Sequence, residues 1–119
     1  MRLSPHFTSE EFECKCGCGL CDVSDALLSY LEDMREELCR PMQIASGCRC
    51  HHHNQDVGGV SNSAHTRGTA ADIVCRGGFE RFQLVTAAVN AGVVGIGVAK
   101  SFVHVDVDED IPRPSAWSY

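Results

Sequence analysis

The sequence predicts an α+β fold, in which helices pack on one side of a small antiparallel sheet. Two segments, residues 24–39 and 79–91, have the apolar spacing of helices. Several shorter apolar segments have the length and composition of strands, namely residues 42–46, 70–74, 93–98 and 102–107. The order of these elements along the chain favours the α+β class.

Size and composition limit the possible functions. With 119 residues and 44% hydrophobic residues, we expect one folded domain over residues 1–119. The formal net charge of -6 argues against a duplex nucleic-acid partner, whose phosphates require a basic face. Because no apolar run is long enough for a membrane span or resembles a signal peptide, we expect no membrane partner and synthesis in the cytoplasm. We also expect a monomer.

Helix signals begin near the N-terminus. Thr8–Glu11 has the hydroxyl and the carboxylate of a capping box, which opens a short helix. Ser24 or Asp22 can cap a longer helix that runs to about Cys39, before Pro41 prevents its continuation. One face of this helix carries four large apolar side chains, those of Leu27, Leu31, Met34 and Leu38.

The middle of the chain alternates between loop and regular structure. Residues 48–68 are rich in Gly, Asn, Ser and His, which favours an ordered loop. Phe79–Ala91 is predicted to be a helix that ends at Gly92, and its apolar spacing comes from Phe82, Val85 and Val89. We expect Phe79, Phe82 and Trp117 to lie in the core or to line a cleft.

The last predicted strand has two different faces. Side chains alternate across a strand, so one face of residues 102–107 carries three valines, Val103, Val105 and Val107. The other face carries Phe102, His104 and Asp106. A strand that buries valines on one face and presents a histidine and a carboxylate on the other indicates a functional site.

A metal site can be built from this strand and the segment before it. His65 and Asp72 can converge if a tight turn at Gly68 sends the chain back, so that Asp72 lies on a strand beside His65. Imidazole nitrogens and carboxylate oxygens are zinc ligands, and His104 would be a third. Three protein ligands leave the fourth tetrahedral position open, which distinguishes a catalytic zinc site from a closed structural one.

These motifs resemble a known family. Ser63-x-His65-x-x-Gly68-x-Ala70-x-Asp72, followed by a strand that bears His104, is similar to the zinc peptidases of the D-alanyl-D-alanine carboxypeptidase group (M15-type). This group includes bacterial and phage enzymes that cut peptidoglycan peptides, and it shares its fold with the hedgehog signalling domain. The similarity extends over nearly the whole chain, through the segments 7–12, 44–49, 53–54, 57–60, 95–97 and 102–106.

The resemblance implies a function and a set of site residues. It implies a zinc-dependent metallopeptidase that acts on peptidoglycan stem peptides, as a carboxypeptidase or as a phage endolysin-type endopeptidase released to the cell wall by a separate route. His65, Asp72 and His104 would bind Zn²⁺. The group carries at the position of Arg49 an arginine that binds substrate or steadies the oxyanion. A non-catalytic zinc-binding domain of the same fold is the alternative.

Two roles remain open within the predicted site. Many relatives have a carboxylate three residues before the last ligand, where this chain has Ser101, so Asp106 is the nearest candidate for the general base. In an alternative register, His104 is the acid–base residue and Asp106 is the third ligand. Ser63 could bind substrate or simply form a turn.

The eight cysteines are the most unusual feature of the composition. Four of them lie close together in the sequence, at Cys14, Cys16, Cys18 and Cys21, and could hold a second, structural metal ion or form disulfides. Free buried thiols are the third possibility. Cys48 and Cys50 flank Arg49, which could activate a nucleophilic thiol, although no histidine–carboxylate pair is obviously aimed there.

Overall fold

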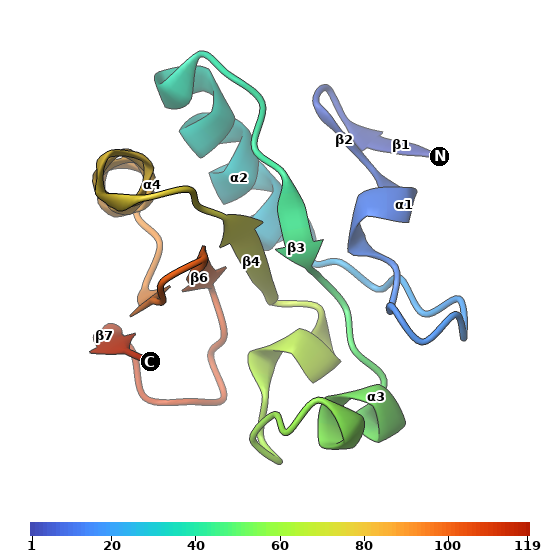
Figure 1. Ribbon diagram of the computed structural model, residues 1–119. Helices are drawn as coiled ribbons and strands as arrows, with labels where there is room; N and C mark the ends of the chain where they lie inside the picture. The colour runs from blue at the N-terminus through green and yellow to red at the C-terminus, as the bar shows by residue number, and fades with distance from the viewer.

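The computed structural model describes all 119 residues and contains a five-stranded sheet with the strand order β3-β4-β6-β5-β7 (Figure 1). The strands are β3 (Ile44–Ser46), β4 (Ala70–Val74), β5 (Gly95–Val98), β6 (Phe102–Asp106) and β7 (Ser115–Ser118). All neighbours are antiparallel except β5 and β7, which are parallel. The predicted α+β class is therefore confirmed, and the sheet is mixed because of β7, a strand that the sequence pattern does not predict.

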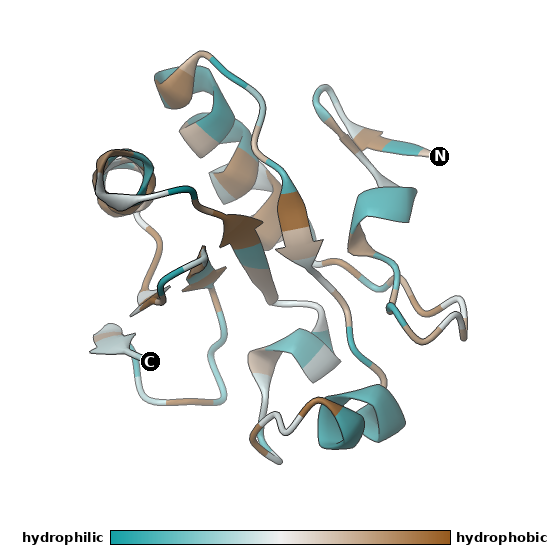
Figure 2. Ribbon diagram, viewed as in Figure 1, coloured by the Kyte–Doolittle hydropathy of each residue, from teal (hydrophilic) through white to brown (hydrophobic).

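The helices α2 (Asp25–Leu38) and α4 (Gly78–Ala91) pack against each other and cover one face of the sheet (Figure 1). The two central strands β4 and β6 contribute Ala71, Ile73, Val103 and Val105 to this core. Strand alternation places Asp72, His104 and Asp106 on the opposite face. Figure 2 shows this pattern in β4, where a hydrophilic band interrupts a hydrophobic strand. The two-faced strand expected at residues 102–107 is thus present.

The N-terminal segment forms its own small layer. The strands β1 (Arg2–Ser4) and β2 (Phe7–Thr8) pair and lead into the short helix α1 (Ser9–Phe12). The backbone N–H of Thr8 donates to Glu11 Oε2 over 2.7 Å, as expected for the capping box. A Cβ at Gly47 would lie 2.7 Å from the Phe12 Cα, so glycine lets the end of β3 approach α1 closely.

The boundaries of α2 decide between the two expected caps. The Ser24 hydroxyl accepts from the backbone N–H of Leu27 over 3.0 Å, so Ser24 rather than Asp22 is the N-cap. Cys39 ends the helix in the left-handed conformation. Of the predicted apolar face, Leu27, Leu31 and Met34 are buried, and Leu38 packs partly buried against the core.

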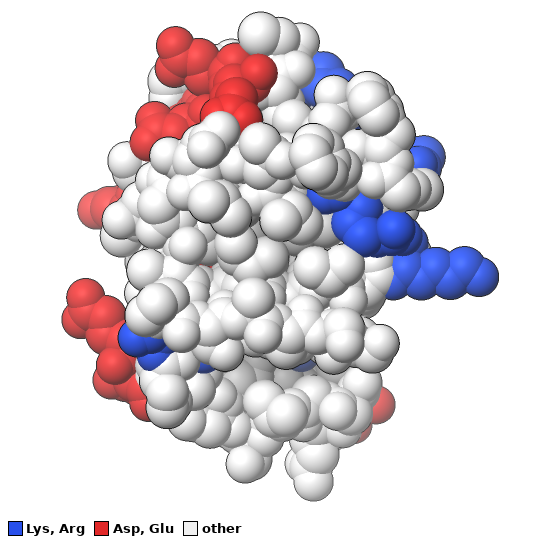
Figure 3. All heavy atoms as spheres, turned by 90° about the vertical axis from the view of Figure 1, so that its left-hand side faces the viewer, with Lys and Arg blue, Asp and Glu red and all other residues white.

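The helix α4 has the expected range and ends at Gly92, but its buried face is different from the predicted one. Phe82 and Val89 are 72% and 60% exposed, and Phe79 is also exposed. The buried side chains are Leu84, Ala87 and Ala88. Val85 of the predicted face packs partly buried against the core, while its larger neighbour Phe82 points outward. Figure 3 shows that the side of the molecule that includes α4 is largely uncharged at its centre.

The segment 48–68 contains more regular structure than expected. It includes the helix α3 (His51–Asp56) and the 3₁₀ helix η1 (Ala64–Arg67), both of which lie away from α2 and α4 (Figure 1). The expectation of mostly ordered loop missed these two elements, because elements this short have too few turns to show periodicity. None of the helices has the length and apolar character needed to cross a membrane.

Candidate metal centre

Three side chains converge on the face of the sheet that the helices leave uncovered. Asp72 of β4 is directly opposite His104 of β6 in the antiparallel register. His65 reaches the same point from η1, and one ligand atom from each of the three residues lies within 4.8 Å of the others. All three residues are buried. The structure thus brings together the expected metal-binding residues, whose role as ligands stays a prediction.

Two local features direct His65 toward the strands. The Ser63 hydroxyl accepts from the backbone N–H of His65 over 3.2 Å and begins η1. Gly68 ends η1 at φ 71°, a left-handed conformation that glycine adopts without strain. A Cβ at Gly68 would also collide with the carbonyl oxygen of Asp22. The turn expected at Gly68 is therefore present, and it leads directly into β4.

The second nitrogen of each histidine has a partner that defines the tautomer. His65 Nδ1 lies 2.7 Å from the carbonyl oxygen of Gly47, which can only accept, so Nδ1 carries the proton. His104 Nε2 lies 2.7 Å from Asp106 Oδ2, which accepts its proton in the same way. In the neutral rings, the lone pairs of His65 Nε2 and His104 Nδ1 therefore face Asp72.

The arrangement fits a divalent metal ion. His65 Nε2 and His104 Nδ1 lie 3.2 and 2.9 Å from Asp72 Oδ1, so three acceptors face one another in a buried space. Such acceptors repel unless a proton or a metal ion lies between them. Ligands of a tetrahedral zinc ion, with bonds of 2.0–2.1 Å, lie about 3.3 Å apart, which is close to the separations found here.

The electrostatics of the two carboxylates favour a cation in the same place. Burial alone raises the pKa of Asp72, but contacts with His104 and His65 outweigh burial and hold that pKa well below its ordinary value. Burial also acts to raise the pKa of Asp106, and Arg113 and His104 overcome it. For His104, burial lowers the pKa while Asp106 and Asp72 raise it above the ordinary value. Both carboxylates are thus held ionised around His104.

Asp106 contacts Nε2 of the His104 ring, and it does not belong to the group of ligand atoms formed by His65, Asp72 and His104. Arg113 donates to Asp106 Oδ1 over 2.8 Å through Nε and to Oδ2 over 2.6 Å through Nη2. Asp106 is 0% exposed, and each of its oxygens accepts at least one hydrogen bond. This geometry suits a residue that orients His104. The role of general base stays a prediction, and Ser101 does not line the cavity.

Arg49 lies beside the metal ligands. Its Nη2 is 3.4 Å from Asp72 Oδ2, and its Nη1 donates to Asn54 Oδ1 over 2.9 Å. Asn54 is buried and in turn donates to the carbonyl oxygen of Val60 over 2.8 Å. The Arg49 Nε donates to the Ser46 hydroxyl over 3.3 Å, so partners from β3, β4 and α3 hold the guanidinium at the site.

A cavity of about 900 Å³ opens over these residues. Its walls include Arg49, Ser63, Arg113, Trp117 and Tyr119 together with the three expected ligands and Asp106. The Trp117 ring lies 5.2 Å from the His104 ring, so the expectation that Trp117 lines a cleft is confirmed. The same expectation was wrong for Phe79 and Phe82, which are exposed on α4.

The sequence analysis did not identify Arg113 as a site residue. Arg113 precedes β7 and stacks over Trp117, with its guanidinium carbon 5.0 Å from the ring centre. No local motif marks this residue, because it reaches the site only through the pairing of β7 with β5. Ser63 does line the cavity, where its hydroxyl caps η1, and its predicted contact with substrate is not tested by this geometry.

The cysteines gather differently from the expectation. Cys14, Cys16 and Cys18 lie together, but the fourth member of the group is Cys50 rather than Cys21. The Cys21 thiol instead donates to the carbonyl oxygen of Ser9 over 3.3 Å. The structure thus places Cys21 beside α1 and apart from the other three thiols. All eight cysteines are free thiols in the structure.

Comparison with known proteins adds one positive finding. No curated protein matches the sequence. The family described as Peptidase M15 matches residues 5–106, a range that includes Arg49 and all three expected metal-binding residues. The match covers most of the chain and agrees with the resemblance seen in the motifs. The chain belongs to the peptidase M15 family.

Proposed function

We propose that this protein is a zinc-dependent metallopeptidase that hydrolyses peptide bonds in the stem peptides of bacterial peptidoglycan. The observation that carries the proposal is the set of three buried acceptors, from His65, Asp72 and His104, on the wall of an open cavity. Two imidazole nitrogens and one carboxylate oxygen are a common ligand set for catalytic zinc. Membership of a peptidase family implies a peptide substrate.

The residues of the chain have separate tasks in this proposal. A bound zinc ion would polarise the scissile carbonyl and lower the pKa of a water molecule. Gly47 and Asp106 orient the two histidine rings through their second nitrogens. The planar guanidinium of Arg49 can donate to the developing oxyanion or to a terminal carboxylate of the substrate.

The cavity wall also supports a particular kind of substrate. Arg49 and Arg113 provide positive charge, which suits the carboxylate groups of stem peptides. Trp117 and Tyr119 provide flat apolar surfaces, against which peptide planes and alanine methyl groups can pack. The choice of peptidoglycan rests on the resemblance in the motifs, and both terminal and internal bonds of the stem are compatible with one metal site.

One observation favours a second candidate, a zinc-binding domain of the same fold that binds its ligand without cleaving it. Asp72 and Asp106 are the only carboxylates that line the cavity. Asp72 is a proposed ligand, and Asp106 already accepts from His104 and Arg113. A general base would therefore have to be Asp106 after release of one of these partners.

Digestion of purified peptidoglycan and muropeptides distinguishes the two candidates. We expect the zinc-loaded protein to release D-alanine or to open crosslinks, as identified by mass spectrometry of the products. A chelator should abolish the reaction and added zinc should restore it. His65→Ala should be inactive, whereas His52→Ala is a matched control, because the His52 side chain is 82% exposed. Binding of muropeptides by the zinc-loaded protein without cleavage would contradict the peptidase and favour the binding domain.

A further inference from the structure

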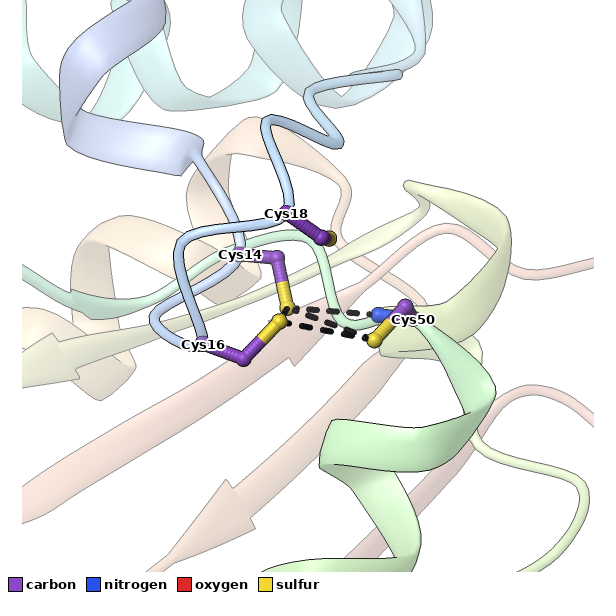
Figure 4. A group of neighbouring side chains, drawn as sticks. All are labelled: Cys14, Cys16, Cys18 and Cys50. Carbon is purple, nitrogen blue, oxygen red and sulfur yellow. Dashed lines mark hydrogen bonds between the residues drawn. The ribbon is translucent and has the colours of Figure 1, made fainter.

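Four cysteine side chains from two distant segments gather next to Arg49. Cys14, Cys16 and Cys18 lie in the turn that follows α1, and Cys50 comes directly after Arg49 as the N-cap of α3. Figure 4 shows the sulfurs of Cys14, Cys16 and Cys50 pointing toward one another. One sulfur from each of the four residues lies within 4.8 Å of the others. This cluster is separate from the histidine–aspartate centre.

The distances between the sulfurs match those of a tetrahedral thiolate site. Cys14 Sγ is 3.4 Å from Cys16 Sγ and 3.8 Å from Cys50 Sγ, and Cys16 Sγ is 3.7 Å from Cys50 Sγ. With zinc–sulfur bonds of about 2.3 Å, the edge of a tetrahedron is about 3.8 Å. A disulfide would instead join two sulfurs at about 2.05 Å. Three nearly equidistant sulfurs show no preferred pair.

The backbone around the cluster is arranged to hold thiolates. The backbone N–H of Cys50 donates to Cys14 Sγ over 3.4 Å, and that of His53 donates to Cys50 Sγ over 3.3 Å. Hydrogen bonds of this kind favour the charged form of the acceptor. Gly17 and Gly19 both have φ 86°, a left-handed conformation that glycine adopts without strain. These two residues allow the short turn in which Cys14, Cys16 and Cys18 lie close together.

We propose that Cys14, Cys16, Cys18 and Cys50 bind a second, structural zinc ion. Four thiolates are the ligand set of closed zinc sites, which have no position left for substrate, and soft sulfur ligands select zinc over the harder divalent cations. The ion ties the N-terminal segment to the connection between β3 and α3. Because Cys50 follows Arg49 in the chain, the site positions the segment that carries Arg49.

Two backbone hydrogen bonds connect the segment that carries Arg49 to its neighbours. The backbone N–H of Arg49 donates to the carbonyl oxygen of His65 over 3.0 Å, and that of Cys48 donates to the carbonyl oxygen of Phe12 over 2.8 Å. The segment 48–50 therefore lies between the N-terminal layer and the turn that bears His65. A metal at Cys50 would hold one end of this segment, and these two hydrogen bonds hold the rest.

Cobalt substitution combined with metal analysis tests the proposal. We expect wild-type protein to bind two equivalents of Co²⁺, one of which gives the intense near-ultraviolet absorption of thiolate–cobalt charge transfer. Cys16→Ser combined with Cys18→Ser should lose one equivalent and this absorption. Both residues are exposed, so the core is not disturbed. Cys39→Ser, an exposed cysteine outside the cluster, should keep both equivalents.

The two metal sites can be separated in the same experiment. His65→Ala should lose the other equivalent and keep the thiolate absorption. The thiolate absorption therefore tests the cysteine site even if the histidine–aspartate centre binds no metal. Absence of the thiolate absorption from cobalt-loaded wild-type protein would overturn the proposal without any variant. The intact mass of protein purified under reducing conditions gives a second test. A mass that is lower than the mass of the fully reduced chain by the hydrogens lost in disulfide formation would also overturn the proposal.

Hydrogen exchange tests the positioning of Arg49. In the double serine variant, the backbone amides of residues 48–56 should exchange faster than in the zinc-loaded wild type, while those of β4 and β6 stay protected. Unchanged exchange in residues 48–56 after loss of the metal would overturn the positioning role.

Discussion

His104 is held from both sides by carboxylates. Asp72 faces Nδ1 over 2.9 Å, and Asp106 accepts from Nε2 over 2.7 Å. Arg113 binds both oxygens of Asp106 in turn, which fixes the plane of that carboxylate. A histidine that donates its second nitrogen to a carboxylate is a common arrangement around metal ions, because the carboxylate fixes the ring and raises its basicity.

Asp106→Asn tests which role this carboxylate has. The substitution keeps the size and removes the charge, so we expect the affinity of the histidine–aspartate centre for zinc to fall by about ten- to a hundredfold. Zinc titration against a competing chelator measures this change. Asp110→Asn is the matched control, since the Asp110 side chain is 75% exposed.

Two other outcomes would contradict a purely orienting role. If zinc affinity is unchanged while the rate falls by about two to four orders of magnitude, Asp106 is the general base. Wild-type affinity together with wild-type rate would exclude both roles for Asp106.

Arg49→Ala removes a fixed positive charge beside the centre. We expect kcat/KM for a muropeptide substrate to fall by on the order of a hundredfold or more, with zinc content and fold retained. Arg49→Lys should restore little of the rate, because an ammonium group cannot donate to Asn54 and substrate in the planar geometry of the guanidinium. Steady-state kinetics with Arg2→Ala as an exposed control provide the comparison. Unchanged kinetics in Arg49→Ala would show that this side chain has no part in the reaction.

At the scale of elements, the strand β5 makes room for the site through its glycines. A Cβ at Gly95 would lie 2.2 Å from Asp106 Oδ1 and 2.5 Å from Arg113 Nε. A Cβ at Gly97 would lie 2.6 Å from the Trp117 Nε1. The glycines that interrupt this strand in the sequence thus allow larger side chains from β6 and β7 to lie across it.

Gly95→Ala should therefore displace the pair formed by Asp106 and Arg113. We expect weaker zinc binding at the histidine–aspartate centre, in the same direction as for Asp106→Asn, without loss of the fold. Gly78→Ala at the start of α4 is the control, because a Cβ there has no neighbour closer than 3.9 Å. Zinc titration of both variants gives the comparison, and equal affinities would show that the site tolerates a side chain at position 95.

The success of sequence patterns differs between elements. The alternation in β6 correctly predicts which face is apolar, because a strand with one apolar face permits only one register. The spacing of large apolar residues in α4 predicts the wrong face, since the helix buries Ala87 and Ala88 against its neighbours and leaves Phe82 exposed. Side-chain size is thus a poor guide where two helices approach closely.

At the scale of the whole molecule, the two faces of the sheet have different roles. One face is covered by α2 and α4 and forms the core, and the other carries the candidate centre and the cavity. The grouping of His65 with Asp72 could be predicted because only seven positions and one glycine turn separate them. The places of Cys50 in the cysteine cluster and of Arg113 in the cavity could not be predicted, since both depend on how distant segments of the chain pack together.

The zinc content of the purified protein tests the central claim most directly. His65→Ala and His104→Ala should each contain one equivalent less than the wild type, because each substitution removes one of three ligands from the centre. His52→Ala, which changes an exposed histidine, should keep the full content. If His65→Ala and His104→Ala both keep the zinc content of the wild type, these residues do not hold the metal, and the proposed centre is wrong.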